Sequence, residues 1–359
     1  MRRRLLALLA DAERNGTLYL YAGCASAVGA VALTLSPTAK PEEGERRTAV
    51  EEGDSLVHWA LSTAESAESV HNQSTTLAQR PSSTSLEAAI MSSAPLEGWP
   101  DPQTKQAVAA DPRPTVSELG GRGLSRVDGC LSGGVVAELL SHVNSVLADA
   151  CSREKEPGSR RHALAEVLCP TQRWDLKLAL APPVVAALRE ALGPLALVCE
   201  AVLGPGAVLH ECAALVADPD APRQPMHPDS PSTSAPAMVT VFIALQDVHA
   251  TMGPTVWLPH THTADAHAAF NAPPASGAKR ALLASSPRQL GVVGRGDAVL
   301  FDSRLLHCGT ANESDARRVI FYFSFRAAAA QVPLGSLDAD LQRRKLRLDS
   351  RGEWLGVCR

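Results

Sequence analysis

The feature that most constrains the fold of this chain is a change of hydrophobic period near its middle, after Gly206. Before that point, apolar residues recur at helical spacing in two stretches, from Val136 to Leu147 and from Pro183 to Leu195. After it, the apolar residues fall into short runs, some of them alternating, that Gly, Pro, Asn and Asp separate. Helices followed by many short strands predict a mainly β (α+β) fold, a sandwich or barrel-like jelly roll with flanking N-terminal helices.

Four short segments of the second half are predicted to be strands. Each is rich in Val, Ile, Phe, Tyr or Trp and is bounded by residues that favour turns. The segments are Val239 to Leu245, Thr255 to Pro259, Ala298 to Asp302 and Val319 to Phe325.

Composition excludes several classes of protein. The chain has 359 residues, a net charge of only −4 and Lys and Arg spread along its length, so no basic stripe indicates a nucleic-acid partner. Its eight cysteines are widely separated and form no C-x-x-C pair. This spacing disfavours both a disulfide scaffold and a thiolate zinc site.

The first 36 residues are predicted to be a membrane anchor or a targeting segment. A charge-free stretch from Leu18 to Leu35 follows three N-terminal arginines and is roughly long enough to span a bilayer. A cleaved signal, a transit peptide and an ordinary helix remain alternatives. The expected location is therefore membrane-anchored or organelle-targeted, and otherwise cytoplasmic.

Residues 37–115 are predicted to be a disordered low-complexity linker. Pro, Ser, Thr, Glu and Ala dominate this segment, and its apolar residues are isolated and without period. Such a sequence buries too little apolar surface to offset the entropy of ordering it. The remaining residues, 116–359, are expected to form the functional domain.

His227 and Asp229 are candidate metal ligands. They lie two residues apart, so in an extended segment both side chains project from the same face. His307, which closely follows the predicted strand ending at Asp302, is the leading candidate for a third ligand. Two histidines and one carboxylate on one side of an ion are typical of non-haem iron(II) oxygenases. The alternative for the His-x-Asp pair is a loop with a surface histidine and a turn-forming aspartate.

Arg317 is predicted to point into the barrel, because it shares strand parity with the apolar residues Val319, Phe321, Phe323 and Phe325. Arg318 shares parity with the more polar face and is predicted to lie outside. A buried guanidinium needs an anion, which a carboxylate-bearing cosubstrate or an internal salt bridge with Asp302 or Asp315 could supply. A further charged face, formed by Arg173, Asp175 and Lys177, could line a pocket or be solvated.

The chain resembles the phytanoyl-CoA dioxygenase family over roughly residues 116 to 326. The segments that carry the resemblance are Gln224 to Asp229, Val241 to His262 and Gly296 to Phe325, in the family's order and spacing. One departure is His260, where the family usually has Gly.

The resemblance implies a double-stranded β-helix in which His227, Asp229 and His307 bind iron(II) and Arg317 binds 2-oxoglutarate. The implied reaction is dioxygenase hydroxylation of a C–H bond in a small-molecule or lipid-like substrate by O2, with release of succinate and CO2; ascorbate is a candidate reductant. With Asp229 in place, the resemblance favours hydroxylation over halogenation. Two alternatives remain, a catalytically silent jelly-roll binding module and a zinc hydrolase that uses the same ligands.

Overall fold

The computed structural model describes residues 83–92, 94–153, 163–165, 167–232, 236–330, 336 and 346–348, together with three short strands, 17–18, 33–34 and 354–355. The chain divides into two compact units, Met1–Pro81 and Ser82–Arg359. In the first unit, β1 (Thr17–Leu18) pairs antiparallel with β2 (Leu33–Thr34). Most of the predicted anchor and the first part of the predicted linker lie outside the described residues. Within the described parts of the chain, no helix is both long and apolar enough to cross a membrane.

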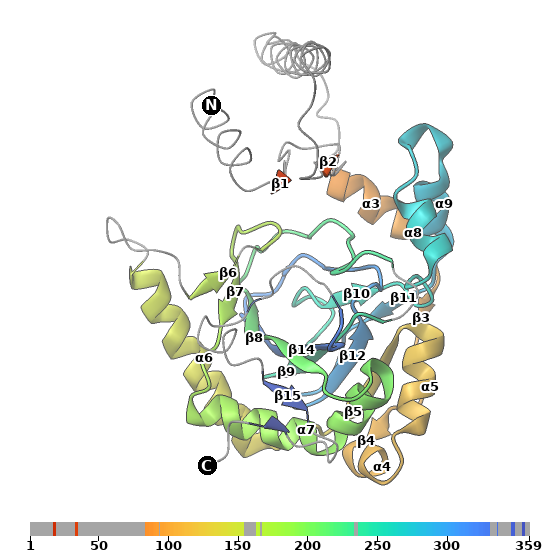
Figure 1. Ribbon diagram of the computed structural model, residues 1–359. Helices are drawn as coiled ribbons and strands as arrows, with labels where there is room; N and C mark the ends of the chain where they lie inside the picture. The colour runs from red at the N-terminus through yellow and green to blue at the C-terminus, as the bar shows by residue number, and fades with distance from the viewer. Residues whose placement is uncertain are drawn as a thin grey trace, which may run out of the picture. The chain divides into compact units, whose positions relative to one another are not determined.

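The second unit is built around a large, mostly antiparallel sheet (Figure 1). Its main path runs β16-β15-β8-β14-β9-β12-β5-β4, and β7 joins β8 and carries β6. The strands are β4 (Gln103–Thr104), β5 (Leu124–Asp128), β6 (Leu164–Ala165), β7 (Arg173–Lys177), β8 (Val208–Ala217), β9 (Met238–Ala244), β12 (Ala298–Asp302), β14 (Arg318–Arg326), β15 (Arg347–Leu348) and β16 (Trp354–Leu355).

A smaller sheet packs against one face of the large one. Its order is β13-β10-β11-β3, with β3 (Leu96–Glu97), β10 (Thr255–Trp257), β11 (Arg288–Leu290) and β13 (His307–Gly309). Trp257 on β10 lies against Phe242 and Phe301 of the large sheet, with ring centroids 6.3 and 5.8 Å away. These contacts close the two sheets into the jelly roll that the sequence predicts, so the expected fold class is confirmed.

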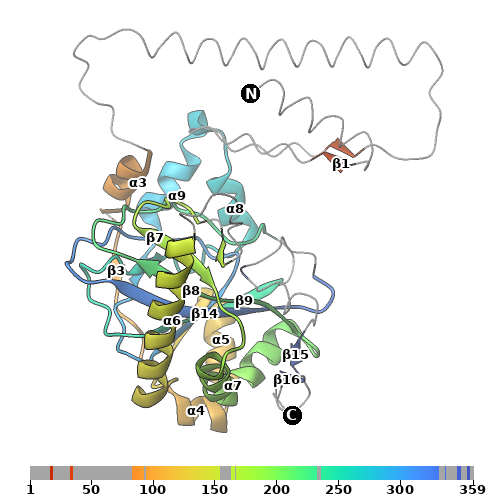
Figure 2. The same cartoon turned by 90° about the vertical axis from the view of Figure 1, so that its left-hand side faces the viewer.

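The two faces of the large sheet differ in what they pack against. On β14, Phe321 and Phe323 belong to the main hydrophobic core, which also holds the buried face of helices α6 (Gly133–Arg153) and α7 (Pro182–Leu203). Figures 1 and 2 show these two helices side by side. The opposite face of β14 carries Ile320 and Tyr322, which join the cluster around Trp257 between the sheets. Strand alternation therefore sends every second residue of the sheet into the barrel.

Shorter helices surround this core. They are α3 (Ser83–Ser92), α4 (Lys105–Ala110), α5 (Arg113–Arg122), α8 (Ala264–Phe270), α9 (Ala278–Ser285) and the 3-10 turn η2 (Pro274–Ser276).

The folded unit begins earlier than the sequence suggests. Helices α3 and α4, strands β3 and β4 and the start of α5 fall within 83–115, so the prediction of a disordered linker is wrong for this part. Its isolated apolar residues dock individually into other elements: Met91 is 2% exposed, Val108 is fully buried and the Trp99 ring lies 6.3 Å from that of Trp257. Burial against distant elements needs no local period, which is why the pattern gave no sign of it.

Candidate active site

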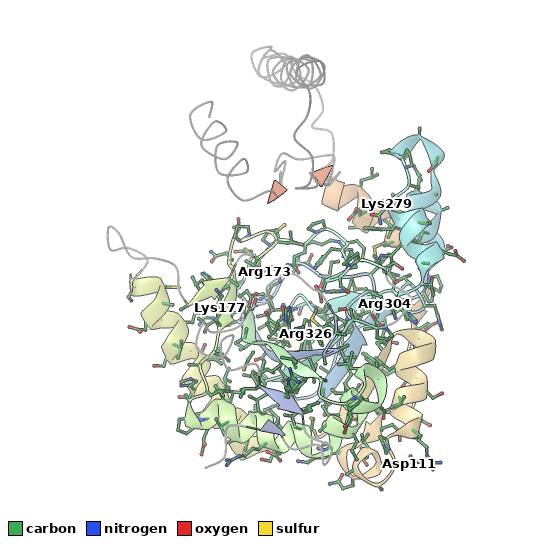
Figure 3. The ribbon with its side chains drawn as sticks, in the orientation of Figure 1. Asp111, Arg173, Lys177, Lys279, Arg304 and Arg326 are labelled. Carbon is green, nitrogen blue, oxygen red and sulfur yellow. The ribbon has the colours of Figure 1, made fainter. Side chains whose placement is uncertain are left out.

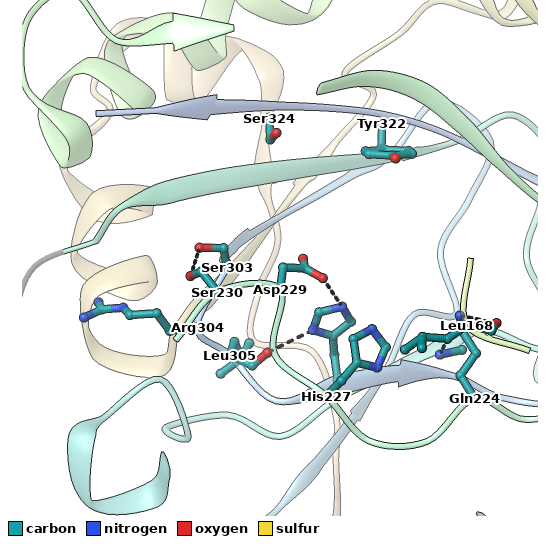
Figure 4. Close-up of polar contacts among 12 residues, drawn as sticks. Leu168, Gln224, His227, Asp229, Ser230, Ser303, Arg304, Leu305, Tyr322 and Ser324 are labelled. Atoms are coloured by element: carbon teal, nitrogen blue, oxygen red, sulfur yellow. Dashed lines mark hydrogen bonds and ion pairs between the residues drawn. The ribbon is translucent and has the colours of Figure 1, made fainter. Parts of the chain in front are cut away.

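The structure brings His227, Asp229 and His307 together on the wall of one cavity. Figure 4 shows His227 and Asp229 close together. His227 lies in the segment between β8 and β9, and His307 begins β13. Their backbones form an isolated antiparallel bridge, with N–O distances of 3.0 Å from His227 to His307 and 2.9 Å in the reverse direction. One candidate ligand atom from each of the three side chains lies within 4.8 Å of the others. The bridge thus holds the loop that carries His227 and Asp229 against the first residue of β13.

Hydrogen bonds orient both imidazoles. Nδ1 of His227 is 2.8 Å from the Pro225 carbonyl oxygen, and Nδ1 of His307 is 2.9 Å from that of Leu305. Because a carbonyl oxygen only accepts, each Nδ1 carries the proton and each Nε2 keeps a lone pair. Nε2 of His307 lies 3.5 Å from Oδ1 of Asp229. An imidazole ring that is oriented by a backbone carbonyl oxygen is typical of histidines that bind a metal.

Burial favours the uncharged form of all three side chains. It lowers the pKa of both His227 and His307 to about 4, so both rings are neutral at pH 7. Burial also raises the pKa of Asp229 to about 6, although the side chain keeps 31% of its surface accessible from the cavity. A bound divalent cation would favour the charged carboxylate and the neutral imidazoles together. The donor set, two nitrogens and one carboxylate, fits non-haem iron(II).

The three ligands open onto a cavity of about 590 Å³ between the sheets. Apolar side chains of the β6 region, among them Leu164 and Leu168, form one part of its wall. Polar and charged groups on the inward faces of β7, β8, β9 and β14 form another part. They are Asp175, Lys177, Glu211, Thr240, Arg318 and Tyr322.

The predicted orientation of Arg317 and Arg318 is wrong, because their places are exchanged. Arg317 lies on the outside of the sheet, where Nε pairs with Oδ1 of Asp218 at 2.5 Å and Nη1 donates to Asn144 of α6 at 3.0 Å. Its salt bridge involves neither Asp302 nor Asp315, the two partners considered from the sequence. Arg318 is 2% exposed and lines the cavity. The apolar parity of β14 faces the helices, and the more polar parity faces the barrel.

Arg318 is a buried cation with few partners. Nη1 donates to the Gly253 carbonyl oxygen, and Nε has no hydrogen-bond partner. Burial, and then the nearby positive charge of Arg173, lowers its pKa to about 9. No carboxylate of the described residues forms an ion pair with it. An anion entering the cavity would therefore meet an uncompensated guanidinium.

The charged face of β7 turns toward the interior, the first of the two alternatives considered from the sequence. Asp175 and Lys177 line the cavity, and the 3% exposed Arg173 donates to the Pro222 carbonyl oxygen at 2.8 Å. Figure 3 shows Arg173 and Lys177 at the β7 side of the barrel. Glu211 and Tyr322 were not singled out from the sequence. Tyr322 shares the parity of Arg318, a signal that would have found it once the inward face was known.

His260, the departure from the family pattern, adopts a left-handed backbone conformation with φ of 68°. Glycine adopts this conformation without strain, which explains why Gly is usual there. Nδ1 of His260 bonds to the Gly121 carbonyl oxygen at 2.9 Å, and Nε2 of His262 bonds to the Gly120 carbonyl oxygen at 3.1 Å. These histidines tie the β10 end to α5 and stand apart from the three-residue cluster.

Two histidines and one carboxylate grouped on the cavity wall of a jelly roll are the arrangement typical of mononuclear non-haem iron enzymes. The sequence profile described as phytanoyl-CoA dioxygenase (PhyH) matches residues 122–320, more than half of the chain. The chain belongs to the phytanoyl-CoA dioxygenase family.

Three solved structures with similar folds are the following. The epimerase SnoN in complex with Fe3+, alpha ketoglutarate and nogalamycin RO is 21% identical, with a TM-score of 0.47 over 62% of this chain and 86% of SnoN. AviO1 from Streptomyces viridochromogenes is 21% identical, with a TM-score of 0.47 over 62% of this chain and 98% of AviO1. HygX from Streptomyces hygroscopicus, with nickel and 2-oxoglutarate bound, is 15% identical, with a TM-score of 0.43 over 60% and 87%. A search of curated proteins found no significant match.

Proposed function

We propose that this protein is an iron(II)- and 2-oxoglutarate-dependent dioxygenase that hydroxylates a C–H bond of a small-molecule or lipid-like substrate. The products of the cosubstrate are succinate and CO2. The observation that carries this proposal is the pairing, in one cavity, of a three-ligand cluster with an unpaired buried guanidinium. Membership of the family supports it independently.

His227, Asp229 and His307 would hold the iron through Nε2, a carboxylate oxygen and Nε2. When bound, iron(II) with 2-oxoglutarate supplies the oxidising chemistry that activates O2. The protein's contribution is to keep the two imidazoles neutral, fix their tautomer and confine the ligands to one side of the ion. Because all three positions carry ligands, the site favours hydroxylation over halogenation.

Arg318 replaces Arg317 as the residue proposed to bind the distal carboxylate of 2-oxoglutarate. Its side chain is buried, lines the same cavity as the metal ligands and has an unpartnered Nε. A carboxylate would pair with the planar guanidinium in a bidentate manner and relieve the cost of burying it. The Thr255 and Gly309 wall of the cavity belongs to the smaller sheet, so the cosubstrate would lie between the two sheets.

The test uses the full chain under anaerobic conditions. Iron(II) and 2-oxoglutarate are added in turn and the visible metal-to-ligand absorption is recorded; oxygen and ascorbate are then admitted and succinate is measured. The dioxygenase gives an absorption that needs both additions and slow succinate formation without substrate, and His227→Ala and His307→Ala lose both. A silent binding module gives neither with wild type. Succinate formation that survives in both variants contradicts the assignment of the ligands.

A further inference from the structure

Three polar side chains form a row across the cavity face of the large sheet. Ser324 on β14 is the register partner of Glu211 on β8 and of Thr240 on β9, so the three share one face. Oγ of Ser324 donates to Oε2 of Glu211 at 2.7 Å. Glu211 and Thr240 both line the cavity that holds the metal ligands.

A second carboxylate approaches this row from β7. Asp175, 6% exposed, accepts bonds from the hydroxyl of Tyr322 at 2.9 and 3.0 Å and from Oγ of Ser336 at 2.5 Å. The backbone N–H of Ser336 also donates to Glu211. Ser336 therefore connects the two carboxylates, which converge on the same part of the wall.

The hydroxyl of Thr240 indicates that a ligand binds beside Glu211. Thr240 is 1% exposed, and its Oγ1 has no hydrogen-bond partner although it lines the cavity. Buried hydroxyls are nearly always hydrogen-bonded in folded proteins. Its neighbour in the row, Ser324, already donates to Glu211. A group inside the cavity is therefore the natural partner for Thr240.

The balance of charge indicates what that group is. With a divalent cation and a dianionic cosubstrate in place, Asp229 and Arg318 are both compensated. Among the described residues, the remaining charged groups of the cavity wall are Asp175, Glu211 and Lys177, which leave one negative charge in excess. Burial raises the pKa of Asp175 to about 6 and that of Glu211 to about 7, and a cation beside them would favour their charged forms.

We propose that Asp175, Glu211 and Thr240 recognise a protonated amine, so that the substrate is an amine-bearing small molecule. An ammonium group donates hydrogen bonds and accepts none, which matches two carboxylates and a hydroxyl oxygen. The apolar wall near Leu164 and Leu168 would take the carbon skeleton. Lys177 lies on the same wall and repels a cation, which places the amine toward Glu211. This inference deepens the proposed function and rests on it.

The test compares three six-carbon probes that differ in head group: hexylamine, hexanol and hexanoate. Each is titrated anaerobically into the full chain loaded with iron(II) and 2-oxoglutarate, and the shift of the visible absorption gives its affinity. Hexylamine is expected to bind about tenfold more tightly than hexanol, and hexanoate most weakly, because charge-assisted hydrogen bonds are the stronger ones. Equal affinities, or tighter binding of hexanol, overturn the inference.

Variants assign the preference to these residues. Glu211→Gln and Thr240→Val keep size and are expected to reduce the preference for hexylamine, while Lys177→Met, which removes the repelling charge, increases it. An intact absorption band reports that each variant is folded and loaded. A preference unchanged in Glu211→Gln and Asp175→Asn overturns the proposed recognition.

Failure of the two proposals is distinguishable. If the absorption never forms, the proposed function fails, and the probes are then ranked by the thermal shift of the metal-free chain. There the excess negative charge still favours hexylamine, and a lower ranking for hexylamine than for hexanol overturns the amine site as well.

Discussion

Arg317 and Arg318 are adjacent in sequence and lie on opposite faces of the large sheet. Arg317 bonds to Asp218 and Asn144 on the helix side, whereas Arg318 is buried beside the cavity and lacks a carboxylate partner among the described residues. This relationship is the basis for proposing that Arg318, and not Arg317, binds the cosubstrate. It also provides a matched pair of variants that differ by one position.

Replacing Arg318 by Met is expected to raise the KM for 2-oxoglutarate roughly 10- to 100-fold, since a bond to a charged group contributes about 1.5–3 kcal/mol. The KM of Arg318→Lys should lie between those of wild type and Arg318→Met, because an ammonium group cannot form the bidentate pair. Arg317→Met is the control and should leave this KM unchanged. Rates of 2-oxoglutarate turnover measure all three, and a raised KM in the control alone would show that the assignment is wrong.

Glu211 predicts a pH dependence of stability in the metal-free protein. Burial raises its pKa from 4.5 to about 7, so the folded state holds a proton that the unfolded state has lost between these values. The stabilising contribution is therefore full below about pH 4.5 and is lost as the pH rises through 7. Glu211→Gln stays neutral and should be more stable than wild type near pH 8, by on the order of 1 kcal/mol. Urea unfolding of both proteins near pH 5 and pH 8 measures this, and parallel profiles would contradict it.

Glu87 on α3 is expected to support the metal site through the backbone. Oε2 accepts from the N–H of Met226, the residue before His227, at 3.1 Å, and Oε1 pairs with Lys279 of α9 at 2.9 Å. Glu87→Ala should weaken metal binding about three- to tenfold, less than the roughly 10- to 100-fold typical of groups that bond directly to a metal ligand. Lys279→Met, which keeps the bond to Met226, should have less effect. Competition with a chelator measures both affinities; identical values for wild type and Glu87→Ala would rule out this role.

The early start of the folded unit predicts the outcome of truncation. A chain that begins at Ser82 should fold, whereas one that begins at Val116 loses the buried Met91 and Val108 and the packing of Trp99. Burying one such side chain contributes about 1.5–3 kcal/mol, so the shorter chain should lose several kcal/mol. Thermal unfolding of the two truncations compares them. Equal transition temperatures would mean that residues 83–115 add no stability.

Local patterns predicted much of the architecture. The runs at 239–245, 298–302 and 319–325 correspond closely to β9, β12 and β14, because alternation and turn residues determine strands directly. The same alternation could not say which face of β14 lies inside the barrel. The helix-covered face is the more apolar one here, and the interior carries Arg318 and Tyr322 because it must accommodate polar ligands.

The candidate site was predictable only in part. The two-residue spacing of His227 and Asp229 follows from strand geometry, but the approach of His307 depends on a backbone bridge between distant segments. Glu211 and Thr240 come together through the register of three strands, which a single sequence does not specify. Site residues that long-range strand pairing brings together therefore could not be identified from local sequence patterns.

The most direct test of the central claim is a crystal structure of the protein grown anaerobically with manganese(II) and 2-oxoglutarate. The account predicts the ion at about 2 Å from Nε2 of His227, Nε2 of His307 and a carboxylate oxygen of Asp229, with the distal carboxylate of the cosubstrate on the Arg318 guanidinium. An ion bound elsewhere, or a cosubstrate carboxylate that makes no contact with Arg318, would contradict it.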